Sequence, residues 1–156
     1  MTVPLQRVGC LELILDTPRG RGVFSTRKIE AGTVVDTAPV IILNKEQFDN
    51  YIRHSLLQHY TYNWPMGHGT TRKYTIHQAI ALGLGSMFNH SSWRQNVGWK
   101  RDLGKEVIVY TALRDIAEGE ELLISYGSHL TFEDVEAARL EEGEEDVTDV
   151  LARIDI

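Results

Sequence analysis

Short β-prone runs separated by turn residues are the feature that most constrains the fold of this chain. The runs lie at 11–15, 33–35, 40–43, 107–110 and 121–127, and turn signals with glycine or proline lie at 18–20, 30–32 and 118–119. Pro39 separates two of the runs and predicts two short strands with a bend, because proline cannot donate to a sheet ladder. The runs do not alternate with helices, which argues against a doubly wound sheet and predicts a β-rich α+β fold.

A few segments predict helices. Asn44 can cap a helix that extends through Arg53, with Gln47 at the third position of a capping box. Thr131 is a second candidate N-cap. Near the end of the sequence, apolar residues recur at helical spacing, at Val147, Val150, Leu151 and Ile154.

Glycine and proline punctuate three other stretches. Residues 63–78 contain Pro65 and two glycines, which predicts a long loop. Gly-x-Gly occurs at 20–22 and again at 83–85, but a dinucleotide-binding fingerprint also needs a third glycine and a helix that follows it. Neither stretch meets that requirement, so we predict no Rossmann-type site.

Composition narrows the function classes. The chain has 156 residues, 42% of them hydrophobic, which is enough for one domain with a real core. Its net charge of −6 argues against a basic nucleic-acid-binding surface. No apolar run approaches the ~20 residues of a membrane-spanning helix. Because Cys10 is the single cysteine, the chain can form neither an internal disulfide nor a cysteine-cluster zinc site, and it fits a reducing compartment. The histidines do not have metal-ligand spacing.

Acidic residues are concentrated at 141–146, in the run EEGEED. Such a run is either a solvated acidic segment or a source of negative potential that attracts a basic partner, such as a tail rich in Lys and Arg.

Asn89, His90 and Ser91 follow a run of small and apolar residues, 79–87, that is typical of a core segment. Burying such polar groups without partners costs a few kcal/mol. They therefore either satisfy one another and the nearby backbone, or they hold something that the protein binds.

Three stretches together resemble the SET-domain family of protein lysine methyltransferases. They are GRGVFS at 20–25, GSMFNHS at 85–91 and IAEGEELLISYG at 116–127. The resemblance covers about 11–127, and the flanking text looks most like the small stand-alone fungal SET enzymes that act on histones.

The resemblance implies small curled β-sheets of the β-clip type around a threaded pseudoknot. It implies a SET domain at 1–130, with a helix and loop inserted at about 44–78. Residues 131–156 are then expected to form a C-terminal helical segment in place of a zinc-binding post-SET region, since no cysteine follows Tyr126. Accordingly, we expect no metal.

The resemblance also implies a reaction and its residues. The chain is expected to transfer a methyl group in line from S-adenosylmethionine to a deprotonated lysine amine, with Tyr126 as the catalytic residue. The expected cofactor-binding residues are Gly20, Arg21, Gly22, Val23, Asn89, His90, Tyr126 and Phe132. The expected walls of the lysine channel are Tyr60, Tyr62 and Tyr110.

Structural roles are the alternative for the same residues. Asn89 and His90 can satisfy the chain crossing, 20–22 can form a plain hairpin turn, and Tyr60 and Tyr62 can be ordinary core or loop residues. The sequence also departs from the family pattern. Many family members have a cysteine where this chain has Ser92, and they have a proline after it that this chain lacks. They also have one residue fewer between the Asn-His-Ser motif and the position of Asn96. These departures leave the role of Asn96 open.

The expected substrate is a histone tail, with the third core histone as the first choice. A basic non-histone substrate, or a SET module that binds a partner without catalysis, are the alternatives. We expect no sequence-specific nucleic-acid binding and no membrane association, and a location in the nucleus, with the cytoplasm also open. The amphipathic end either folds onto the domain or pairs with a second copy to form a homodimer.

Overall fold

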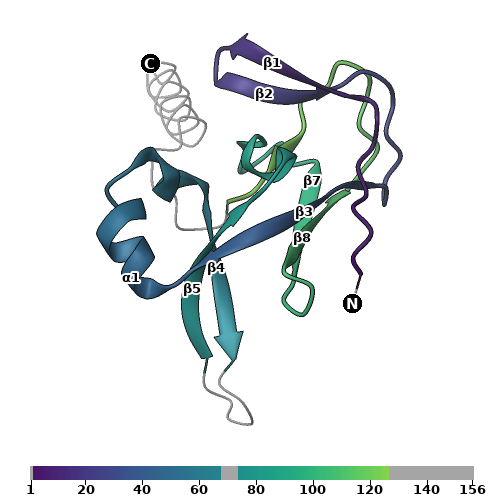
Figure 1. Ribbon diagram of the computed structural model, residues 1–156. Helices are drawn as coiled ribbons and strands as arrows, with labels where there is room; N and C mark the ends of the chain where they lie inside the picture. The colour runs from purple at the N-terminus through teal and green to yellow at the C-terminus, as the bar shows by residue number, and fades with distance from the viewer. Residues whose placement is uncertain (1, 68–73, 127–156) are drawn as a thin grey trace, which may run out of the picture.

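The computed structural model describes residues 2–67 and 74–126, and short strands dominate this part of the chain (Figure 1). The strands are β1 (Leu11–Thr17), β2 (Gly20–Ser25), β3 (Val34–Leu43), β4 (Thr61–Gly67), β5 (Tyr74–Ala81), β6 (Asn89–His90), β7 (Val97–Asp102), β8 (Val107–Ala112) and β9 (Leu123–Ile124). Among the described residues they form a five-stranded sheet, β4-β5-β3-β8-β7, and two two-stranded sheets, β1-β2 and β6-β9. The predicted β-rich fold is confirmed.

β3 is the central strand, and it differs from the prediction. The expected bend at Pro39 does not divide the strand in two. Instead β3 changes its partner there, because Val34–Pro39 pair with β8 whereas Val40–Leu43 pair with β5. Proline has no N–H for the ladder, but its carbonyl still accepts a hydrogen bond from the N–H of Leu82 at 2.8 Å.

The prediction of a loop over 63–78 is wrong for the residues that the structure describes. β4 and β5 form an antiparallel hairpin in which Trp64 pairs with His77 and Pro65 with Ile76. Proline is tolerated because β4 is the edge strand of its sheet. Trp64 is completely buried, so this hairpin also contributes to the core.

The helical segment before β4 begins as predicted. The Asn44 side chain accepts a hydrogen bond from the N–H of Gln47 at 2.8 Å, and the Gln47 side chain accepts one from the N–H of Asn44 at 3.0 Å. This capping box starts α1 (Lys45–Gln47), which continues as the π-helical turn η1 (Phe48–Ile52). A 3-10 helix, η2 (Leu56–Tyr60), then leads into β4.

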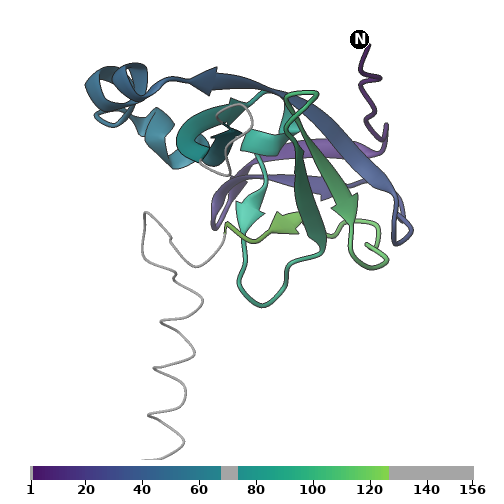
Figure 2. The same ribbon diagram turned by 90° about the horizontal axis from the view of Figure 1, so that it is seen from below.

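Residues 119–126 run between two other segments, 22–25 and 89–96, and bond to both (Figure 2). On one side the N–H of Leu122 donates to the carbonyl of Val23 at 2.8 Å. On the other side β9 pairs in parallel with β6, which follows the short 3-10 helix η3 (Leu84–Ser86). This crossing brings chain segments about 100 residues apart into one layer.

Asn96 ties this crossing together. Its side chain is completely buried. The amide nitrogen donates to the carbonyl of Glu121 at 2.8 Å and to Oε1 of Glu120 at 3.0 Å, and the amide oxygen accepts from the N–H of Leu123 at 2.8 Å. The role that the sequence left open is therefore structural.

The core lies where the three sheets meet. Its largest completely buried side chains are Trp64, Tyr110, Phe88, Ile108, Ile116, Leu122 and Ile124. No helix in 2–67 or 74–126 is long and apolar enough to cross a membrane. Thr131, Phe132, the acidic run at 141–146 and the apolar stripe at 147–154 lie outside the described residues.

Candidate active site

A pocket of about 320 Å³ lies where η2, β4, β7 and the end of the described chain meet. Its walls are mostly polar and aromatic: Phe48, Gln58, His59, Tyr60, Thr61, Tyr62, Asn63, Gln78, Gly85, Ser86, Trp99, Arg101 and Tyr126. The structure thus brings together three tyrosines that the sequence singled out, from positions as far apart as 60 and 126.

Tyr126 is held at both ends. Its backbone N–H donates to Nδ1 of His90 at 3.1 Å, and its hydroxyl donates to the carbonyl of Phe88 at 2.6 Å. The pairing of β9 with β6 brings these groups together, since Tyr126 follows β9 by two residues. Burial, and to a smaller extent Tyr62 and Tyr60, raise the pKa of the Tyr126 hydroxyl above its ordinary value, so it remains a donor at neutral pH.

The same contacts fix the orientation of the His90 ring. Because Nδ1 accepts from the backbone of Tyr126, Nε2 carries the proton and donates to Oγ of Ser92 at 3.0 Å. Ser92, which stands where many family members have cysteine, therefore has a partner in the motif itself. The ring centres of His90 and Tyr126 are 5.2 Å apart.

Asn89 connects the crossing to β2. Its amide nitrogen donates to the carbonyl of Arg21 at 2.9 Å and to Oε1 of Glu121 at 2.7 Å. A β-carbon on Gly22 would lie 2.5 Å from that carboxylate oxygen and 3.1 Å from the Asn89 amide nitrogen. A side chain at position 22 would therefore displace the Glu121 carboxylate and crowd the Asn89 amide, a constraint that a plain hairpin turn would not impose.

The neighbours of Gly22 have separate roles. Gly20 has a φ of +82°, and open space surrounds the position where its β-carbon would be. The Arg21 side chain extends to η2, where its Nη2 donates to the Tyr60 hydroxyl at 3.2 Å. Val23 is completely buried, so its side chain belongs to the core and only its backbone is available to a ligand.

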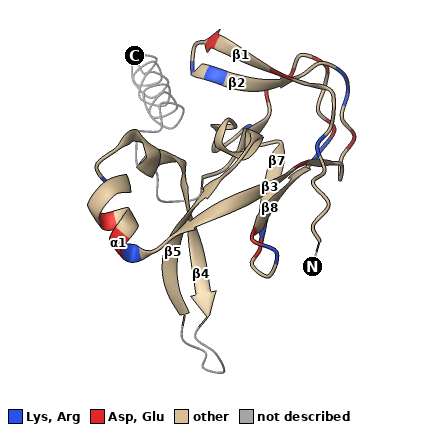
Figure 3. Ribbon diagram, in the orientation of Figure 1, with Lys and Arg blue, Asp and Glu red and all other residues tan. Residues whose placement is uncertain are grey.

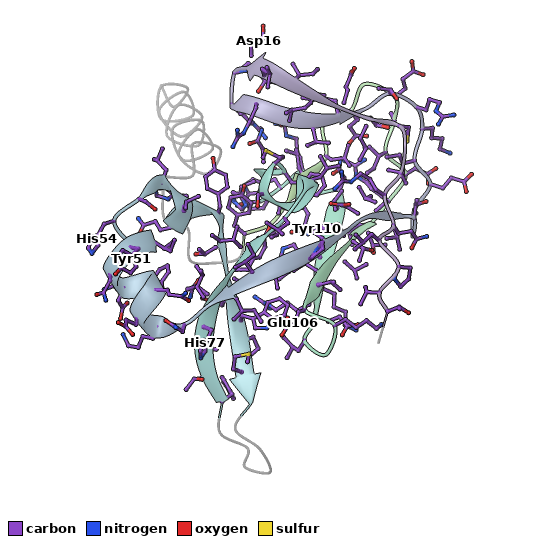
Figure 4. All side chains as sticks on the ribbon, in the orientation of Figure 1. Asp16, Tyr51, His54, His77, Glu106 and Tyr110 are labelled. Atoms are coloured by element: carbon purple, nitrogen blue, oxygen red, sulfur yellow. The ribbon has the colours of Figure 1, made fainter. Side chains whose placement is uncertain are left out.

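The inner wall of the pocket is a hydrogen-bonded aromatic group. The Tyr62 hydroxyl donates to the carbonyl of Gly85 at 3.0 Å and accepts from the Tyr110 hydroxyl at 3.0 Å. Tyr110 is completely buried in the interior of the fold (Figure 4). It does not line the pocket but supports the wall through its hydrogen bond to Tyr62.

Trp99 is a wall residue that the sequence reasoning missed. Its ring meets the Tyr62 ring edge to face, with centres 5.2 Å apart and planes at 78°. Its Nε1 donates to the carbonyl of Ser125 at 2.8 Å, immediately before Tyr126. The available signal was alternation along 97–102, which puts Trp99 and Arg101 on one face of the strand.

Charged side chains lie mainly on loops and turns, and β4 and β5 carry none (Figure 3).

Within the described ranges, no group of three or more His, Cys, Asp or Glu could hold a metal ion. The polar groups that could hold a cofactor are instead the Asn89 amide, the Glu121 carboxylate, the His90 ring and the exposed backbone of Gly20 and Arg21.

Comparison with known proteins agrees with this architecture. The model of the SET domain family matches residues 20–127. A protein from Schizosaccharomyces pombe is 44% identical over 135 residues, covers 85% of each chain and is named histone-lysine N-methyltransferase, H3 lysine-37 specific.

Two solved structures share the fold. A candidate histone methyltransferase from Plasmodium falciparum superposes with a TM-score of 0.56 at 23% identity, over 80% of this chain and 96% of that one. A SET protein from Cryptosporidium has the same TM-score at 22% identity, over 79% of this chain and 60% of its own.

Proposed function

Because the chain belongs to the SET-domain family, we propose that it is an S-adenosylmethionine-dependent protein lysine N-methyltransferase that acts on the tail of histone H3. The site that we propose is lysine-37 of H3, since the 44% identical relative is named for that specificity. The net charge of −6 favours a basic substrate. From a histone substrate we infer that the protein acts in the nucleus.

The observation that carries this proposal is the position of Tyr126. It is the point where the crossing segment reaches the aromatic pocket, and both its backbone and its hydroxyl are held by 88–90. A phenol fixed in this way can orient a small acceptor group in the pocket. Because its pKa is raised, the Tyr126 hydroxyl keeps its own proton at neutral pH and cannot act as a base. The pocket therefore suits a reaction that needs alignment rather than a strong base.

The residues around Asn89 fit S-adenosylmethionine. The cofactor carries an ammonium and a sulfonium cation, and the Glu121 carboxylate and the Arg21 carbonyl are acceptors that suit positive groups. The Asn89 amide nitrogen lies between them and donates to both, and the amide oxygen is a further acceptor for a positive group. Gly22 keeps this network close to β2, because any side chain there would meet both Asn89 and Glu121.

We assign cofactor contact to the Asn89 amide, the His90 backbone and ring, and the backbone of 20–22. When bound, S-adenosylmethionine supplies a methyl group on a sulfonium, which a neutral amine attacks in line. Tyr62 and Trp99 shape the space for the lysine side chain and exclude bulk water, while the Tyr126 hydroxyl orients the amine. Holding reacting groups in alignment contributes several kcal/mol to such a step, and the amine proton leaves to water.

The proposal is tested with isotope-labelled S-adenosylmethionine, purified core histones and nucleosomes, with products located by peptide mass spectrometry. We expect label on H3 at lysine-37, and none on H3 in which lysine-37 is replaced by arginine. Label on another histone lysine would overturn the site, and label only on basic non-histone proteins would overturn the substrate. Cofactor binding without label on any protein would indicate a non-catalytic SET module.

A further inference from the structure

An arginine whose Nε atom has no hydrogen-bond partner within the described part of the chain lies in the wall of the pocket. Arg101 follows Trp99 by two residues on β7, and its guanidinium carbon is 4.6 Å from the centre of the Trp99 ring. This is the distance of a cation–π contact. The Nε atom is buried and meets no hydrogen-bond acceptor among the described residues.

The described wall of this pocket has no carboxylate to balance Arg101. The other titratable groups on it are His59, Tyr60, Tyr62 and Tyr126. Arg21 approaches the same rim through its hydrogen bond to a wall tyrosine. The acid next to Arg101 on β7 is Asp102, and it is paired with Lys105 at 3.0 Å. Glu121 belongs to the network on the cofactor side. The pocket is therefore an electropositive place for a residue that is itself a cation.

The positive charge of Arg101 acts on Tyr62, which lies on the inner wall of the pocket. Burial lowers the pKa of the Arg101 guanidinium from its ordinary value, so the charge lies in a partly dehydrated setting. Burial raises the pKa of the Tyr62 hydroxyl, and the charge of Arg101 opposes that rise in part. Charges in such a setting are screened less than surface charges and act over longer distances.

Resting on the proposed function, we propose that Arg101 selects the neutral form of the substrate lysine. A fixed positive charge beside the amine disfavours the ammonium form and so increases the fraction of bound lysine that has a lone pair. The displaced proton leaves to solvent. Arg101 acts through space on the acceptor and does not touch the reacting atoms.

This role predicts a pH signature. In Arg101→Gln the pKa of the bound lysine rises by about one unit, so the neutral fraction near pH 7.5 and the rate of transfer fall about tenfold. The deficit shrinks as the pH approaches the reference lysine pKa of about 10.4, where the amine is neutral in either protein. Arg101→Lys keeps the charge and therefore keeps most of the effect.

The experiment measures kcat for an H3 peptide from about pH 7 to 10.5, because kcat reports ionisations in the enzyme–substrate complex. Lys100→Gln is the matched control. It removes the same charge from the adjacent residue, which is exposed and points to the other face of β7. A second readout needs no turnover: the N-methyl ¹³C shift of a labelled monomethyl-lysine H3 peptide, titrated in the complex with S-adenosylhomocysteine.

We expect an upward shift of both the kinetic and the NMR pKa in Arg101→Gln and none in Lys100→Gln. Identical profiles in wild type and Arg101→Gln would overturn this inference and leave the proposed function intact. A change in KM of equal size at every pH would also overturn it, since that is the effect of a lost substrate contact. No label on any H3 form by the wild-type protein would overturn both.

Discussion

Replacing Asn96 by alanine is predicted to destabilise the whole domain, although Asn96 is not on the wall of the pocket. Its buried side chain makes hydrogen bonds that join the segment at 96 to the crossing segment at 120–123. In Asn96→Ala the N–H of Leu123 loses its acceptor and the carbonyl of Glu121 loses a donor. Each group left unsatisfied costs about 1–3 kcal/mol, so we expect a loss of about 3–5 kcal/mol.

That loss is a large part of the stability of an ordinary domain, which is about 5–15 kcal/mol. The assay is urea denaturation followed by tryptophan fluorescence and circular dichroism, with free energies from the midpoint at a common m-value. Gln95→Ala is the matched control. Gln95 is the neighbouring residue, it is half-buried, and its side chain makes one hydrogen bond to the carbonyl of Val97 at 3.1 Å. We expect a loss of about 1 kcal/mol or less there.

A second variant tests the geometry of the same tie. Asn96→Asp keeps an acceptor for the N–H of Leu123 but turns a carboxylate toward the carbonyl of Glu121 and the carboxylate of Glu120. It should be at least as destabilising as alanine at neutral pH, and the loss should shrink on acidification, since a protonated carboxyl can donate. A loss below about 1 kcal/mol in Asn96→Ala would refute the reasoning that this side chain holds the crossing.

Two further predictions follow from the site and its surroundings. Gly22→Ala would place a β-carbon 2.5 Å from Oε1 of Glu121, so we expect calorimetry to show at least tenfold weaker binding of S-adenosylhomocysteine. The control is Gly9→Ala, whose β-carbon would meet nothing within 4 Å and which should bind normally. Equal affinities of the two variants would contradict the assignment. The pKa of Glu120 is lowered to about 2, mainly by the hydrogen bond from Arg114. The ionised Glu120 therefore stabilises the fold fully above the unfolded pKa of about 4.5, and this stabilisation is lost as the pH falls toward 2. Arg114→Gln should flatten the pH dependence of the unfolding free energy between about pH 5 and 2.5, and an unchanged dependence would exclude this pair as the cause.

Local signals in the sequence predicted local structure well. The capping box at Asn44 depends on two residues three apart, and both bonds are present in the structure. The motif residues Tyr126, Asn89 and His90 come together as the family resemblance implies, because β6 and β9 pair.

Features that depend on distant partners were not predictable. The 63–78 stretch contains strand residues with a proline and glycines among them, and only its place at the edge of a sheet makes that acceptable. Pro39 similarly marks a change of partner within β3, which no property of the residue itself reveals. Asn96 is polar and looked ambiguous because its partners lie about 25 residues further along the chain.

The pocket wall shows the same division. Tyr60 and Tyr62 were chosen as aromatic residues near a motif, and they do line the pocket. Trp99 and Arg101 were missed because their place on the wall depends on a contact between β4 and β7, which are the two edge strands of the five-stranded sheet. Tyr110 was expected on the wall and lies behind it, since its position on β8 is completely buried.

The most direct test of the central claim is the effect of Tyr126→Phe on methyl transfer to histone H3. The variant removes one hydroxyl and keeps the ring beside His90, so the fold and the affinity for S-adenosylhomocysteine should be close to those of the wild type. The account predicts a loss of transfer of at least about a hundredfold, in the range that one positioned catalytic group contributes. Transfer at the wild-type rate by Tyr126→Phe would contradict it.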